Sequence, residues 1–346
     1  MPKAVDKKIN GVIVMRIFKF SLAVCAMLAA VCAGHADPIK IRLAYVVPVS
    51  NWAPLFAEKK DLAKHWGTSY DFEAVRYQGT PPMITALAVN ELEIADLAYS
   101  TLGLAIQNAG LDDLEVIGDE FQDGAPGYYS DEFFVRKDGG IAKIEDLKGN
   151  VIATNATGSG IDIAMKAMLH KHGLEDKRDY TTLEAPFPAM AAMLAEKKVD
   201  LVPGVLPFSL NPALRDPSNV LFTQKEGVGR TQMIIWTARK SFLDKNRAAM
   251  VDFMEDVLRI ERWYLDPKNH ADVVAIGAKL LKVPPERLDW LFTKQDYYRD
   301  PDGKPDLDAL KKNVDITKEL GFFSGSVDLA KHTDLSIVEE AAKRLQ

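Results

Sequence analysis

Apolar and polar positions follow two periodicities that alternate along the chain. Short runs rich in β-branched and aromatic residues predict strands, and stretches with apolar residues three or four positions apart predict helices. The expected strands are 39–47, 70–77, 94–97, 114–118, 131–136, 151–155, 180–184, 199–202, 220–223 and 231–237. The main expected helices are 52–66, 80–90, 101–108, 161–173, 187–197, 246–265, 270–281, 285–292 and 307–320. Strand–helix alternation at this spacing indicates an α/β protein whose parallel sheets are covered by helices on both faces.

The alternation stops and restarts once, which predicts two lobes. Residues 137–140 (Lys-Asp-Gly-Gly) are expected to cross into a second unit that repeats the strand–helix pattern. The strong strand 231–237 is expected to cross back to the first unit, and the helices after it complete that unit. The expected domains are therefore a discontinuous lobe I at 37–137 and 232–346, and an inserted lobe II at 138–231. Two crossing segments between two lobes predict a hinge.

Residues 1–36 have the pattern of a secretory signal peptide. A short basic region at 15–19 precedes an apolar run at 20–31, which is too short to span a bilayer comfortably. Small residues precede Ala36, so cleavage is expected after it, and Met15 is an alternative start. A lipoprotein anchor at Cys25 or Cys32 is the less favoured alternative, because a valine precedes each where a small residue is preferred.

Removal of this leader changes both the cysteine content and the charge. The chain has 2 cysteines, at positions 25 and 32, so the expected mature chain has none and cannot form disulfides, thiolate metal sites or a cysteine nucleophile. The Lys+Arg count falls from 43 to 38 and the Asp+Glu count from 49 to 48, so the net charge moves from −6 to −10. Such a surface disfavours nucleic acid and anionic lipid as partners.

Two predicted helix starts are candidates for an anion site. Thr80 precedes Pro81 and is expected to cap one helix, while Ser159 precedes another and has Asp162 three residues on. The N–H groups of a first helical turn have no partner inside the helix and lie at the positive end of its dipole. If both starts face one cleft, they suit a carboxylate, sulfonate or phosphate group.

Several segments in order along the chain resemble the nitrate/sulfonate/taurine group of ABC-transporter substrate-binding proteins. The segments are 41–45 (IRLAY), 78–83 (QGTPPM), 86–95 (ALAVNELEIA), 134–141 (FVRKDGGI), 147–149 (LKG) and 192–200 (AMLAEKKVD). The resemblance implies the type II periplasmic-binding-protein clamshell, with two doubly wound α/β lobes. It also implies a periplasmic protein, a ligand in the interlobe cleft, and delivery to an inner-membrane permease and its ATPase.

The resemblance also implies ligand-binding positions. They are Asn51, Trp52, Gln78, Gly79, Thr80, Tyr99, Ser100, Thr101, Thr157, Gly158, Ser159 and Gly160. Phe187 and Phe208 belong to a set of aromatic residues expected near the cleft, where they would suit the flat body of an organic ligand. Many relatives have an acidic or Trp-Glu pair before Pro-Phe at this place, where this chain has Val205-Leu206 before Pro207-Phe208. That departure disfavours an amine-bearing ligand such as taurine.

These observations predict a monomeric, non-enzymatic binding protein for a small organic anion, without cofactor or metal. The histidines are scattered over predicted helices and a late loop, which does not favour a metal site. The main alternative is an enzyme like the one that makes the thiamine pyrimidine, or a binder of that pyrimidine's precursor. That enzyme has the same fold but a cysteine-rich segment that is absent after residue 36. A receptor-like sensor module would need a fused signalling domain.

Overall fold

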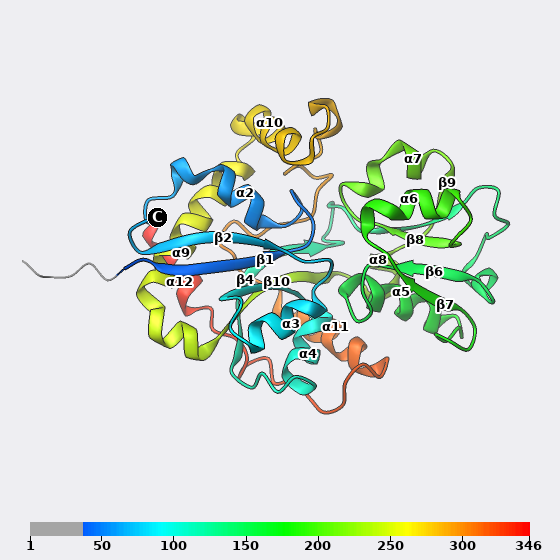
Figure 1. Cartoon of the computed structure of the whole chain (residues 1–346), viewed down its shortest axis with the longest axis horizontal. Coiled ribbons are helices and arrows are strands. Elements are labelled where there is room, and N and C mark those ends of the chain that lie inside the picture. Colours follow the sequence, from blue (N-terminus) through cyan, green and yellow to red (C-terminus); the bar gives the residue numbers. More distant parts are fainter. Residues whose placement is uncertain (1–36) are drawn as a thin grey trace, which may run out of the picture. The chain divides into compact units, whose positions relative to one another are not determined.

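The computed structural model describes residues 37–346, which form two α/β lobes (Figure 1). The expected signal peptide lies outside the described residues. The sheet of lobe I contains β2 (Tyr70–Arg76), β1 (Ile39–Tyr45), β3 (Ile94–Ala98), β10 (Thr231–Arg239) and β4 (Leu114–Asp123), in that order. The sheet of lobe II contains β7 (Thr181–Glu184), β6 (Val151–Thr154), β8 (Leu201–Gly204), β5 (Glu132–Arg136) and β9 (Ser218–Thr223), in that order. The two-lobe α/β prediction is confirmed.

Helices surround each sheet. Lobe I has α2 (Trp52–Glu58), α3 (Pro81–Ala88), α4 (Tyr99–Gln107), α9 (Lys240–Leu265), α10 (His270–Leu281), α11 (Leu307–Glu319) and α12 (Ser336–Arg344). Lobe II has α5 (Gly160–Lys171), α6 (Phe187–Ala195), α7 (Pro212–Arg215) and α8 (Gln224–Val228). No helix among residues 37–346 has the length and apolarity that a membrane crossing requires.

Both sheets are mixed rather than purely parallel. In lobe I, β1 runs parallel to β2 and β3, but β10 is antiparallel to β3 and β4. In lobe II, β6 runs parallel to β7 and β8, but β5 is antiparallel to β8 and β9. Each antiparallel strand is one that enters its sheet from the other lobe, so the two crossings account for the mixed topology.

The chain crosses from lobe I to lobe II earlier than the sequence predicts. β5 pairs with β8 and β9, so it belongs to lobe II, and the chain crosses at residues 124–131 rather than at 137–140. Glu132 to Val135 of β5 pair with β8 in a regular ladder. The sequence pattern alone could not assign β5 to either sheet. The return crossing, between α8 and β10, lies close to the expected position.

Two expected helices are shorter in the structure. The helix predicted at 52–66 ends at Glu58, and Trp66 instead stacks on Phe56 with ring centroids 5.5 Å apart. The segment predicted as a helix at 285–292 forms only a 3-10 turn, Pro285–Arg287. In both cases the apolar residues still pack into the lobe I core, so apolar spacing alone overestimated the helix length.

β4 is the strand that most affects the cavity described below. All ten of its residues are buried, although Glu115, Asp119, Glu120 and Asp123 are acidic. One side of β4 pairs with β10. On the other side, the N–H groups of Val116, Asp119 and Gln122 donate to the carbonyls of His332, Gly303 and Tyr298. A C-terminal segment therefore covers an edge that would otherwise face solvent.

Candidate functional site

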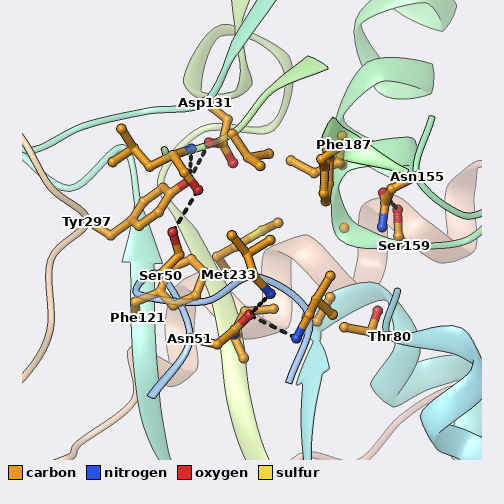
Figure 2. Close-up of a pocket in the computed structure, with 18 residues that line it drawn as sticks. Ser50, Asn51, Thr80, Phe121, Asp131, Asn155, Ser159, Phe187, Met233 and Tyr297 are labelled. Carbon is orange, nitrogen blue, oxygen red and sulfur yellow. Dashed lines mark hydrogen bonds between the residues drawn. The ribbon is translucent and has the colours of Figure 1, made fainter. Parts of the chain in front are cut away.

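A cavity lies between the lobes where strand ends and helix starts from both meet (Figure 2). The space open to the centres of water-sized spheres is about 50 Å³, which is room for roughly three to five waters. Lobe I contributes the loop after β1, the start of α3 and parts of β4 and β10, and lobe II contributes the start of α5 and the segment after β8. The carboxyl ends of strands are where open α/β sheets bind ligands.

The start of α5 faces this cavity. Ser159 is the N-cap, and its hydroxyl accepts a hydrogen bond from the Asp162 N–H (3.3 Å) and donates to Asn155 Oδ1 (2.8 Å). Gly160 and Ile161 are the first two helical residues, and both line the cavity. Their N–H groups have no partner inside the helix and lie at the positive end of its dipole. This helix start can therefore receive an anionic group.

The start of α3 contributes differently from the prediction. Thr80 lines the cavity, but its side chain makes no capping bond, and Pro81 and Pro82 at the first two helical positions have no N–H. The Met83 N–H donates to the Thr80 carbonyl at 3.1 Å. The expectation of a set of free amides here is therefore wrong. The donor that remains is the Thr80 hydroxyl, which is buried without a hydrogen-bond partner among the described residues.

Three other predicted residues hold the lobes together instead of lining the cavity. Tyr99 donates its O–H to the Gly160 carbonyl and Ser100 donates to the Gly158 carbonyl, each at 2.8 Å. Gln78 Nε2 donates to the Asn155 carbonyl at 3.1 Å. These bonds run from lobe I to the loop that leads into α5, so they fix the direction in which that helix start faces.

The remaining predicted residues lie away from the cavity. Trp52 is buried against Tyr264 and Phe292, Thr101 bonds back to the Ala98 carbonyl, and Gly79 packs against Ala156. Thr157 lies in a separate polar hollow, and Phe208 stacks on Phe187 in a hollow beside the cavity mouth. Of the fourteen predicted residues, the cavity is lined by Asn51, Thr80, Ser159, Gly160 and Phe187. Ligand contact by any of them stays a prediction.

Asn51 is held in place by Glu120, a buried acid beside Asp96 that the sequence did not reveal. Its Oδ1 accepts the N–H groups of Val46 and Val47, and its Nδ2 donates to Glu120 at 3.0 Å. Glu120 also accepts the Trp52 N–H, so it occupies the start of α2. Burial raises the pKa of Glu120 to about 7, and burial together with Glu120 raises the pKa of Asp96 well above its usual range. Burial therefore favours the protonated form of both acids.

A second acid lies at the opposite wall. Asp131, from the first crossing, lines the cavity and accepts the O–H of Tyr297 at 2.5 Å (Figure 2). The same tyrosine oxygen accepts the Leu206 N–H at 3.1 Å, and the Leu206 carbonyl accepts the Ser50 hydroxyl at 2.7 Å. Both backbone groups of Leu206 are thus bound to lobe I. Neither Asp131 nor Tyr297 stood out in the sequence.

Most of the remaining lining is apolar. Phe121, Val205, Leu206, Met233 and Ile234 all contribute, with Phe187 at the lobe II wall. Val205 and Leu206 are the positions that departed from the family pattern in the sequence, and here they supply apolar surface. A ligand with an apolar body fits this lining better than an inorganic oxyanion, which needs polar groups on every side.

Among residues 37–346, one group has the spacing of metal ligands. His65, Asp252 and Glu255 bring ligand atoms within 4.8 Å of one another. The guanidinium of Arg344, however, lies 2.8 Å from Asp252 Oδ1 and 3.6 Å from Glu255 Oε2, and Arg259 also pairs with Glu255. The carboxylates are already neutralised by arginines, so the group is a surface ion-pair network. None of its members lines the cavity.

Comparison with known proteins supports the same fold. Residues 130–268 match the family model described as NMT1/THI5 like, and no curated protein matches the sequence. The alkanesulfonate-binding protein SsuA from Xanthomonas axonopodis pv. citri, solved with MOPS bound, has a TM-score of 0.69 and 18% identity. Its alignment covers 86% of this chain and 99% of that chain.

Two further structures widen the comparison. The periplasmic nitrate-binding protein NrtA from Synechocystis PCC 6803 has a TM-score of 0.69 and 14% identity, with 89% of each chain covered. The desulfurization enzyme DszB has a TM-score of 0.63 and 15% identity, with 89% of this chain and 100% of that chain covered. Residues 130–268 are therefore similar to the NMT1/THI5-like family, and the chain shares the two-lobe fold of these sulfonate-binding, nitrate-binding and desulfurization proteins.

Proposed function

We propose that this protein is the extracytoplasmic solute-binding component of an ABC importer and that it captures a small organic anion between its lobes. The observation that carries the proposal is one cavity lined by both the start of α5 and Thr80, whose buried hydroxyl has no hydrogen-bond partner among the described residues. The anionic group of the ligand would lie against Gly160, Ile161 and Thr80. Hydrogen bonds to a charged group contribute about 1.5–3 kcal/mol each.

The apolar wall selects an organic ligand in this proposal. A sulfonate or carboxylate would place its apolar body against Phe121, Leu206 and Met233, which line the cavity. A periplasmic location, a monomeric state and delivery to an inner-membrane permease and its ATPase complete the proposal. The location and the delivery rest on the expected signal peptide at 1–36 and on the sulfonate- and nitrate-binding neighbours.

Binding without turnover is also part of the proposal. DszB shows that an enzyme can have this fold. The described cavity lining, however, has no histidine, lysine or cysteine, and its one carboxyl group, that of Asp131, already accepts the Tyr297 O–H. A ligand recovered after incubation with the protein should be unchanged by mass spectrometry and NMR.

A ligand screen tests the proposal directly. We expect the melting temperature to rise with at least one member of a panel of aliphatic and aromatic sulfonates and carboxylates, because a ligand that binds only the folded state stabilises it by about 2.7 kcal/mol at a hundred times its Kd. Nitrate and sulfate serve as matched inorganic controls and should give smaller shifts. No shift with any organic anion, or a larger shift with nitrate, would contradict the proposed ligand class.

The Thr80 hydroxyl supplies a second test. Thr80→Val keeps the side-chain shape but removes the donor, so we expect a loss of about tenfold to hundredfold in affinity for a ligand from that panel. The free energy of unfolding should not fall, since the buried hydroxyl has no partner to lose. Thr80→Ser is the control and should retain most of the affinity. Equal affinities of Thr80→Val and the wild type, measured by calorimetry, would remove Thr80 from the site.

A further inference from the structure

The described cavity lining has no positively charged side chain, although the proposed ligand is an anion. Among the described residues that line it there is no lysine, arginine or histidine, and the one carboxyl group is that of Asp131. An ionised Asp131 would repel an anion held at the start of α5, because little water separates charges in so small a space. The protonation state of Asp131 therefore decides which charge the cavity accepts.

Asp131 is paired with a second carboxyl group. It is 1% exposed, and its backbone N–H donates to Asp123 Oδ2 at 2.7 Å. Asp123, at the end of β4, is fully buried and accepts the Ser130 hydroxyl at 2.7 Å through its other oxygen. The charge of Asp123 disfavours ionisation of Asp131, so the two buried carboxyl groups titrate as a pair.

The charges around this pair do not relieve the repulsion. Glu132, next in the chain, carries a further negative charge but is bound by Arg215. Lys225 on α8 lies near Asp123, and its positive charge lowers the pKa of Asp123 relative to burial alone. The neutral titratable groups that face the pair are Tyr99, Tyr129 and Tyr297. Burial raises the pKa of Asp123 to about 7. Burial and the charge of Asp123 together raise the pKa of Asp131 well above its usual range.

We propose that Asp131 and Asp123 make ligand binding proton-linked, so that an organic anion enters the cavity together with one proton taken from solvent onto this pair. The protonated Asp131 then offers the anion a neutral wall or a hydrogen-bond donor in place of a negative charge. This inference rests on the proposed function, since it concerns the same cavity and the same class of ligand.

The linkage has a definite sign. A bound anion disfavours the ionised pair, so the affinity should fall about tenfold for each pH unit above the pair's highest pKa in the free protein. An ammonium group beside Asp131 would show the opposite trend, because it favours the ionised pair. The pH dependence of binding therefore separates anionic from amine-bearing ligands without any knowledge of the natural solute.

Isothermal titration calorimetry of the full-length mature protein tests the inference. The probes are ethanesulfonate, benzenesulfonate, benzoate and MOPS, titrated from about pH 5.5 to pH 8.5 in Bis-Tris, imidazole and Tris, which carry no sulfonate that would compete. Above the pair's highest pKa in the free protein, the wild type should take up close to one proton per ligand, as measured from the heat's dependence on the buffer, and below that pKa it should take up fewer. Asp131→Asn, which keeps an acceptor for Tyr297, should take up close to none and bind with little pH dependence.

Glu115→Gln is the matched control. Glu115 is a buried acid at the opposite end of β4 that does not line the cavity, so this variant should keep the wild-type proton uptake. Uptake that is absent in the wild type, or that persists in Asp131→Asn, would overturn the inference and leave the proposed function standing. Affinity that rises with pH would overturn both the inference and the anionic class. If no probe binds at any pH, both proposals fail. Should Asp131→Asn not fold, the wild-type proton uptake decides alone.

Discussion

The protein should lose stability as the pH rises from about 5 to 8, which is the reverse of the usual acid sensitivity of proteins. The cause is the set of acids buried around β4. Burial raises the pKa of Asp119, Glu120 and Asp123 to about 7 each. Burial also raises the pKa of Asp96, Asp131 and Glu261 well above the usual range. In the unfolded chain such groups titrate near pH 4.

The direction of the effect follows from the number of bound protons. Between about pH 4 and pH 7 the folded protein holds protons that the unfolded chain has released, so each rise in pH favours unfolding. The stabilisation from these groups is fully present below the unfolded pKa and is lost as the pH passes the folded pKa. Each group can contribute up to about 1.4 kcal/mol per pH unit within that window.

Carboxylates whose pKa is lowered by a cation do not offset this trend in the same window. Asp179, which is hydrogen-bonded to Arg178, has a pKa lowered to about 2, so its contribution is lost only under more acidic conditions. Differential scanning calorimetry should therefore show a melting temperature about 5 °C or more higher at pH 5.5 than at pH 8. Glu120→Gln should flatten the dependence, because it removes one titrating group. A melting temperature that stays constant or rises over this range would contradict the buried-acid account.

The parts of the fold that depend on local pattern were predictable from the sequence. The alternation of strands and helices gave the two lobes, and the capping residue Ser159 gave the start of α5 where the structure has it. These features depend on residues a few positions apart, which the sequence displays directly. The start of α3 was also located, but the effect of Pro81 and Pro82 on its donors was not taken into account.

The acidic side of the cavity could not be predicted, because residues distant in the chain create it. The segment around β4 reads as a short strand followed by charged residues of the kind that usually face solvent. Those acids become buried only because Tyr298 and Gly303, nearly two hundred residues later, pair with the outer side of β4. Tyr297 reaches Asp131 from the same segment. One C-terminal segment therefore both covers the strand and completes the cavity wall.

That segment also brings in the cation that balances the buried acids. Arg299 is 3% exposed, lies 3.1 Å from Asp296 Oδ2, and donates to the Ser50 carbonyl at 2.8 Å. Its charge lowers the pKa values of Asp119, Glu120 and Glu261 relative to burial alone. The guanidinium thus contacts the Ser50 backbone and stabilises the ionised forms of Asp119, Glu120 and Glu261, which do not line the cavity themselves.

Arg299→Met should destabilise the protein by about 3–5 kcal/mol near pH 8, because it removes one partner of a buried ion pair and leaves Asp296 uncompensated. Methionine keeps the apolar contact that the side chain makes above Phe292, where the guanidinium carbon lies 4.7 Å from the ring centroid. The loss of unfolding free energy should therefore reflect the missing charge rather than altered packing. Urea unfolding followed by tryptophan fluorescence measures it.

The pH dependence of this variant distinguishes the charge argument from a simple packing defect. At about pH 5 the neighbouring acids are protonated in the folded state, so less negative charge is left unpaired when Arg299 is replaced. The loss of unfolding free energy should therefore shrink by half or more. Arg344→Met is the matched control, since Arg344 pairs with Asp252 at the partly exposed network on α9 and should cost about 1 kcal/mol or less. A deficit for Arg299→Met that is the same at both pH values would mean that packing, not the balance of buried charge, is what Arg299 provides.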